Sequence, residues 1–196
     1  MSRVHDRIPG GQGPVSDADE EALVQAAQRD IAAFGPLYAR YQDRIYTYLC
    51  TRTGQAEDAA DLTQQVFTQA LAALPRYRAR GISIAAWLFR IARNVATDWQ
   101  RCRRPMVPWD AVPEAFHPRA PETADGALLR RETFAPLYTL LAGLDAQTRE
   151  ALILRFTAQL TLAEIGAVLG KSEDAARKQI TRALHTLKEQ YHDDPA

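Results

Sequence analysis

The chain has 196 residues, the length of one large domain or of two small ones, and its 24 Lys and Arg residues balance its 24 Asp and Glu residues. A net charge of zero argues against a protein that binds nucleic acid over its whole surface, and an apolar fraction of 46% excludes wholesale disorder. The sequence has no uninterrupted apolar stretch of about 18 residues and no signal-peptide core in its polar N-terminal segment, so we expect a cytoplasmic protein without a membrane span.

Two helices are predicted after a flexible tail over residues 1–16. Acidic side chains follow Ser16 and favour a helix over 17–29, because they complement the positive end of the helix dipole. The next helix begins near Pro36 and ends at Gly54. Apolar residues at helical spacing predict one buried face for it: Leu37, Tyr38, Tyr41, Ile45, Tyr48 and Leu49.

A third helix is predicted over 57–74, where Pro75 ends it. Its buried face is apolar. Its opposite face has a polar stripe at spacing i, i+3, i+4 and i+7, formed by Asp61, Gln64, Gln65 and Thr68. This stripe is not basic, so it cannot hold DNA. It is either a solvated face or a surface that docks on another protein.

The segment 76–104 has the strongest charge signal in the chain. It contains eight arginines against one acid, Asp98, a net charge of +7. It includes a short loop and a helix predicted over 84–103, on which Arg90, Arg93, Asn94, Thr97 and Arg101 form a polar stripe. Arginines interleaved with aromatic rings are typical of single-stranded nucleic-acid binding. The alternative is that the rings belong to the core: Tyr77, Trp87, Phe89 and Trp99.

A proline-rich segment divides the chain. Residues 105–126 contain five prolines and four acidic residues against one arginine, which predicts an extended acidic linker. Strand-like alternation is weak throughout, so the fold class is all-α, with two small helical domains. The predicted divisions are a tail (1–16), a first domain (17–104), the linker (105–126) and a second domain (127–196).

The second domain is predicted to contain several helices. An apolar stretch over 128–141 is interrupted by Pro136. Asp145 caps a helix to about residue 158, with Ala151, Leu152 and Phe156 facing inward. A short helix follows from Thr161 to Gly170, and a longer helix follows from Ser172 to about Tyr191.

The last two helices and the short turn between them match the helix-turn-helix plan. The final helix separates into an inward apolar face (Ala176, Ile180, Ala183, Leu184 and Leu187) and an outward polar face (Arg177, Lys178, Thr181, Arg182 and His185). The outward face could read bases in duplex DNA, or it could be an ordinary solvated basic face.

Nothing in the sequence indicates catalysis. Cys50 and Cys102 are far apart, the four histidines are scattered, and no Gly-rich phosphate loop or Ser/His/Asp arrangement is present. We therefore expect no metal site, no cofactor and no enzymatic activity.

Three motifs in order resemble the bacterial sigma-70 family of RNA polymerase sigma factors. They are DLTQQVF at 61–67, AWLFRIARNVATDWQR at 86–101 and TLAEIGAVLG at 161–170 with the helix that follows. The length, the two lobes and the linker are similar to the extracytoplasmic-function (ECF) group, which keeps only the sigma-2 and sigma-4 domains. The resemblance covers about residues 20–190.

The resemblance implies a partner for each surface. Asp61, Gln64 and Gln65 would dock on the β′ clamp of core RNA polymerase, with Gln65 in place of a frequent Glu and Phe67 as a core support. Single-stranded promoter DNA would contact the loop 76–84, which would hold a flipped base, and the following helix: Arg76, Arg78, Arg80, Ser83, Arg90, Arg93, Asn94 and Arg101. Duplex promoter DNA would contact the second domain: Arg177, Lys178, Thr181, Arg182, Arg149 and Thr161. Further implied partners are the β subunit and an anti-sigma factor.

Two other functions are consistent with the motifs. A stand-alone helix-turn-helix regulator with a sensing N-terminal lobe would be a dimer that binds palindromic sites without polymerase. A helical adaptor that binds only protein would tolerate charge reversal at Arg177 and Arg182.

Overall fold

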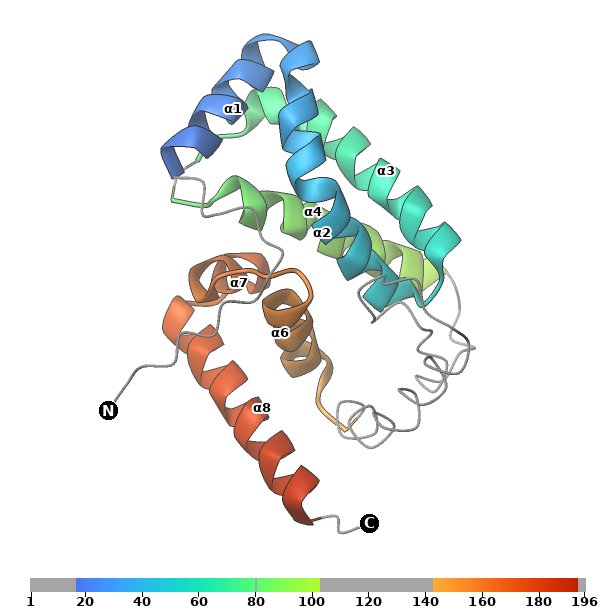
Figure 1. The fold of residues 1–196 in the computed structure, drawn as a ribbon, viewed down its shortest axis with the longest axis vertical. Coiled ribbons are helices and arrows are strands. Elements are labelled where there is room, and N and C mark those ends of the chain that lie inside the picture. Colours follow the sequence, from blue (N-terminus) through green and yellow to red (C-terminus); the bar gives the residue numbers. More distant parts are fainter. Residues whose placement is uncertain (1–16, 80, 103–142, 194–196) are drawn as a thin grey trace, which may run out of the picture.

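The computed structural model describes residues 17–79, 81–102 and 143–193, which form helices and short connections with no β-strand among them. The N-terminal lobe contains α1 (Asp17–Arg29), the 3-10 helix η1 (Ile31–Phe34), α2 (Gly35–Thr53), α3 (Ala56–Ala73), the 3-10 helix η2 (Leu74–Arg76) and α4 (Ile84–Cys102). The C-terminal lobe contains α6 (Ala146–Phe156), α7 (Leu162–Leu169) and α8 (Glu173–Asp193) (Figure 1). The all-α prediction is confirmed for the described residues.

Local signals in the sequence set the helix ends of the N-terminal lobe. Gly54 ends α2 in the left-handed conformation, with φ of 72°, which glycine adopts without strain. Pro75 ends α3, and the chain continues as one 3-10 turn. The sequence reading missed η1, whose first turn is capped by Asp30 accepting a hydrogen bond of 2.9 Å from the Ala32 amide.

The core of the N-terminal lobe lies between α2, α3 and α4. Tyr41, Ile45, Tyr48 and Leu49 of α2 are completely buried, as are Val66 of α3 and Phe89 of α4. The rings of Tyr48 and Phe89 meet edge to face, with centroids 5.6 Å apart. This core leaves the opposite face of α3 in solvent, whereas α7 packs against α4 from outside the core.

The caps predicted for the C-terminal lobe are confirmed. Asp145 accepts hydrogen bonds of 3.0 Å from the amides of Gln147 and Thr148 at the start of α6. Thr161 and Glu164 form a capping box at the start of α7, and Gly170 ends α7 with φ of 69°. A tight helix-turn-helix follows, because α7 and α8 pack against each other directly after the turn.

Three residues expected to face inward are exposed, and these predictions were wrong. Tyr38 is 39% exposed, Phe156 is 61% exposed and Leu184 is 43% exposed. Successive helical residues diverge by about 100°, so Leu184 turns outward beside the buried Ala183. Phe156 is the last residue of α6, and Tyr38 lies at the edge of its face, with its ring 4.6 Å from that of Phe67.

The two lobes are in contact. α7 packs against α4, and α6 packs against α2 (Figure 1). Three predictions fall outside the described residues: the linker over 105–126, the helix over 128–141 and the Ser16 cap. Among the helices that are described, none has the length and apolar character needed to cross a membrane.

Candidate nucleic-acid interface

The polar stripe of α3 is fully on the surface. Asp61, Gln64, Gln65 and Thr68 are all exposed, whereas Leu62, Val66 and Phe67 on the other side are buried. The Thr68 hydroxyl donates to the Gln64 carbonyl over 2.8 Å, so it is used within the helix. The stripe therefore presents one carboxylate and two amide side chains to solvent. It provides no cation for a phosphate.

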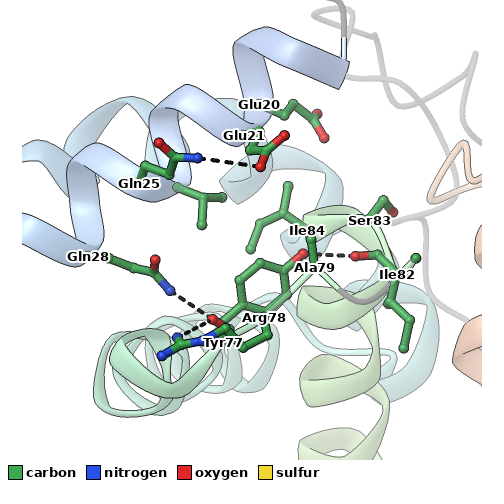
Figure 2. A pocket seen from close by; sticks show the side chains of 12 residues that line it. Glu20, Glu21, Gln25, Gln28, Tyr77, Arg78, Ala79, Ile82, Ser83 and Ile84 are labelled. Carbon is green, nitrogen blue, oxygen red and sulfur yellow. Dashed lines mark hydrogen bonds between the residues drawn. The ribbon is translucent and has the colours of Figure 1, made fainter.

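A cleft of about 490 Å³ lies between α1 and the loop that leads into α4 (Figure 2). This volume is within the range of about 300–1,000 Å³ usual for sites that hold small ligands or parts of larger ones. The walls come from two segments: Glu20, Glu21, Val24, Gln25 and Gln28 of α1, and Tyr77, Arg78, Ala79, Gly81, Ile82, Ser83 and Ile84 of the loop and the start of α4.

Hydrogen bonds hold the loop against α1. The Gln28 side chain donates to the carbonyls of Leu74 and Tyr77, each over 2.9 Å. Across the turn, the Tyr77 hydroxyl donates to the Ile82 carbonyl over 2.8 Å, and Gly81 takes a φ of 75°. Burial and the nearby charges of Glu20 and Glu21 raise the pKa of Tyr77, so the phenol remains a neutral donor near pH 7. The cleft is therefore a shaped, pre-formed feature.

The aromatic residues of the basic segment contribute mainly to the core. Tyr77 and Phe89 are buried, and Trp87 and Trp99 pack against the core while remaining partly exposed. The rings of Tyr77 and Trp87 are 4.9 Å apart. The core alternative is correct for Tyr77 and Phe89: the Phe89 ring is completely enclosed, and the Tyr77 ring is 8% exposed and also lines the cleft.

The basic side chains of this segment have different environments. Arg76, Arg78, Arg90, Asn94 and Arg101 are exposed and Arg93 is half-buried. Arg101 lies 3.6 Å from Asp98. Arg78 donates to the carbonyl of Tyr77 over 2.8 Å. Arg80 lies outside the described residues.

Ser83 and Arg90 reach across to the C-terminal lobe. The Ser83 hydroxyl donates to Glu164 over 2.8 Å and also accepts from the Ala86 amide at the start of α4. Arg90 donates to the Ala167 carbonyl over 2.5 Å. Both contacts are made with α7.

The outward face of α8 is available to solvent. Arg177, Lys178, Thr181 and Arg182 are exposed, and Arg177 pairs with Glu173 at 2.6 Å within the helix. Exposed pairs of this kind are worth little, so the Arg177 guanidinium can exchange this carboxylate for another anion. The other two predicted duplex contacts are engaged locally: Arg149 donates to the Leu144 carbonyl over 2.8 Å, and Thr161 caps α7.

Family models match both halves of the chain in the expected order. Sigma-70 region 2 matches residues 37–105, and sigma-70 region 4 matches residues 140–189. The chain is 32% identical over 188 residues to the ECF RNA polymerase sigma factor BldN of Streptomyces coelicolor, covering 92% of this chain and 70% of BldN. It is 38% identical over 177 residues to ShbA of Streptomyces griseus, covering 85% and 92%.

The chain belongs to the ECF group of sigma-70 factors. Like the rest of that family, this sigma factor binds core RNA polymerase, directs promoter-specific transcription initiation and is not an enzyme. Its fold is similar to that of CnrH in complex with the cytosolic domain of CnrY, with a TM-score of 0.65 and 26% identity over 90% of this chain and 99% of CnrH. Bartonella quintana RpoE, solved with the anti-sigma factor NepR, shares the fold at a TM-score of 0.58 and 21% identity, over 83% and 98% of the two chains.

Several residues that line the cleft or join the two lobes were missed in the sequence. Glu21, Gln25 and Gln28 line the cleft from α1, about fifty residues before the loop, and no local pattern links them to it. Glu150 is a lone carboxylate beside an apolar run, and it is 4% exposed in the structure. A buried carboxylate must have partners, but the sequence could not identify them.

Proposed function

We propose that the two lobes of this sigma factor have different functions. The N-terminal lobe, residues 17–104, docks on the β′ clamp through the α3 stripe and melts and holds the start-proximal promoter element. The acidic segment 105–126 is the linker, residues 1–16 are a tail, and residues 127–196 read the upstream element as duplex. The exposure of Asp61, Gln64 and Gln65 on one face of α3 supports the docking role.

The cleft beside the loop 77–84 is the proposed receptor for a flipped base. The melted strand would continue along α4, where Arg90, Arg93, Asn94 and Arg101 follow one another, with Arg76, Arg78, Arg80 and Ser83 at the loop. Because extrusion of a base costs a few kcal/mol, a shaped site and nearby cations are both required. The shape and the hydrogen bonds of the cleft support this assignment.

One observation carries the proposal: the zero net charge is a sum over separate surfaces. The segment 76–104 has a net charge of +7, whereas the α3 stripe bears a single carboxylate.

Residues 171–191 carry five basic and three acidic side chains, a net charge of only +2. Phosphate neutralisation supplies most non-specific affinity for DNA, so α8 should bind duplex weakly without polymerase. The bases would be read by Arg177, Lys178, Thr181 and Arg182, and the phosphates of the DNA would be contacted by Arg149 and Thr161.

A protein partner of the anti-sigma type is also proposed, with the cytoplasm as the location. CnrH, which is similar to this chain over almost its whole length, was solved with the cytosolic domain of another protein. A factor that works on core polymerase and chromosomal DNA must meet both in the same compartment.

Run-off transcription with core polymerase and a genomic library tests the proposal. Asp61→Arg should abolish promoter-specific transcripts by placing a cation at the centre of the docking stripe. Ala73→Arg is the matched control, because it adds the same side chain at an exposed position of the same helix that lies outside the stripe, about 120° around the helix from Asp61. Loss of activity in both variants, or in neither, would refute the assignment of the docking face.

A further inference from the structure

One wall of the cleft comes from a helix that lies outside both family matches. Sigma-70 region 2 matches residues 37–105, so α1 precedes it in the chain. Five residues of α1 nevertheless line the cleft, opposite the loop 77–84. Two of them, Glu21 and Gln25, are exposed and lie on the α1 side of the space in Figure 2. The side chains that a base would meet across from the loop therefore come from α1.

α1 is fixed in place near both of its ends. In the first turn, Oε1 of Glu20 accepts a hydrogen bond of 2.5 Å from the Tyr41 hydroxyl and lies 2.9 Å from the Arg40 guanidinium, both on α2. Burial and the Glu20 carboxylate raise the pKa of Tyr41 well above its ordinary value, so the phenol remains a donor. In the last turn, the Gln28 side chain donates to two carbonyls of the segment that leads into the loop. This wall of the cleft is therefore held against α2 and against the loop.

The polar groups that line the cleft differ in how far their hydrogen-bonding capacity is already used. The Gln28 amide and the Tyr77 hydroxyl hold the loop, and Arg78 donates to a carbonyl of its own segment. Glu21 and Gln25, in contrast, are hydrogen-bonded only to each other within the described part of the chain, over 3.4 Å, which is longer than usual for such a bond. These two side chains can therefore turn to a ligand without the loss of a strong contact.

A carboxylate in this position favours bases that carry an exocyclic amine. An ionised carboxylate only accepts hydrogen bonds, and the amines of cytosine, adenine and guanine donate them. Thymine has no amine, and its single ring N–H lies between two carbonyl oxygens whose lone pairs would face the carboxylate. The Gln25 amide, one turn further along α1, adds a donor for the acceptor atom next to the amine.

We infer that α1 is the specificity wall of the cleft: Glu21, assisted by Gln25, accepts a hydrogen bond from the exocyclic amine of the extruded base and rejects thymine. The inference rests on the proposed function, since that places the extruded base in this cleft. The loop 77–84 encloses the base, and α1 reads its edge. The negative charge of Glu20 and Glu21 also repels phosphate, so the base enters the cleft while the backbone stays beside the arginines of the segment 76–104.

The test is run-off transcription by the sigma factor on core polymerase, from a promoter recovered with the genomic library. All four bases are placed in turn at each position of the start-proximal element. The templates are heteroduplexes already unpaired over this element, so differences in melting energy do not enter. At one position, thymine should lower transcription about tenfold relative to the preferred amine-bearing base, which is the ratio expected for one good base contact.

Glu21→Gln should reduce this ratio to about twofold at that position and leave the other positions unchanged. The reason is that an amide both donates and accepts hydrogen bonds, so it tolerates a thymine carbonyl. Asp19→Asn is the matched control, because it removes the same charge from an exposed residue of α1 that is not among those lining the cleft. The control should keep the tenfold ratio, and circular dichroism of each variant would establish that the helices are retained.

Ala79→Trp separates this inference from the proposed function. Ala79 is exposed and lines the cleft from the loop side, so a tryptophan there fills the space and should lower transcription from every template about tenfold. Unchanged transcription in Ala79→Trp would refute the cleft as the receptor of the base, and with it the inference. If Ala79→Trp lowers transcription, three results would overturn the inference alone: a tenfold ratio that survives in folded Glu21→Gln, the same loss of selectivity in Asp19→Asn, or thymine tolerated as well as the other bases at every position.

Discussion

At Gly166 the structure shows directly which atoms an added side chain would meet. It lies within α7 of the helix-turn-helix, and a Cβ atom at this position would be 2.8 Å from the Lys171 carbonyl oxygen and 3.2 Å from the Glu173 amide nitrogen. Both neighbours are backbone atoms of the turn, so they cannot move aside as a flexible side chain could. Only glycine allows α8 to approach α7 this closely.

The cost of Gly166→Ala follows from two opposing effects. Overpacking of this kind costs about 1–3 kcal/mol. Replacement of Gly by Ala inside a helix recovers about 0.5–1 kcal/mol of backbone entropy. From the middle of both ranges we expect a net loss of about 1 kcal/mol in the free energy of unfolding of the C-terminal lobe, together with a displaced α8 and weaker promoter recognition.

Urea denaturation followed by circular dichroism measures this effect, and Gly35→Ala is the matched control. A Cβ atom at Gly35 meets nothing within 4 Å, and the residue already has helical φ and ψ of −49° and −46°. The control should be neutral or stabilising by up to about 1 kcal/mol. If Gly166→Ala were as stable as the unaltered chain, the steric reasoning would be refuted.

Three further predictions concern the caps and the DNA surfaces. Asp145→Ala should lower the free energy of unfolding, measured in urea, by about 1 kcal/mol. Hydrogen bonds from Thr148 and Gln147 hold the pKa of Asp145 below its ordinary 3.8. The loss of stability in the variant should therefore persist at neutral pH and disappear as the pH falls through this lowered pKa. Arg182→Glu should abolish promoter-specific run-off transcription while co-purification with core polymerase is retained; loss of both would indicate a folding defect. In a gel-shift assay the isolated factor should bind promoter duplex poorly, and tight specific binding without polymerase would contradict the weak +2 charge of residues 171–191.

Much of the fold was readable from local patterns. The ends of α2, α6 and α7 follow from Gly54, Asp145, Thr161 and Gly170, because a cap is satisfied by atoms only a few residues away. The exposed stripe on α3 follows from helical spacing alone. The family resemblance followed from three motifs in order, and both family models match.

Local patterns failed where exposure depends on a neighbouring element. Phe156 and Leu184 have apolar spacing on their own helices, but the partner that would cover them is absent from those positions in the described structure. The arginine–aromatic pattern of 76–104 was ambiguous for a similar reason. Charge is a property of the sequence, whereas the inward direction of Tyr77 and Phe89 depends on how α4 packs.

By itself the sequence determined the helices, their caps, the separation of charge into distinct surfaces and membership of the sigma-70 family, because each depends on residues near one another in the chain. Tertiary structure alone decided three features: the cleft between α1 and the loop 77–84, the burial of Glu150 against Tyr48 and Arg52, and the engagement of Ser83 and Arg90 by α7. Each joins segments about fifty to one hundred residues apart. The geometry of the cleft arises only when α1 packs against the loop within the N-terminal lobe, and the geometry of the other two arises only when the lobes pack, so no short-range pattern encodes any of them.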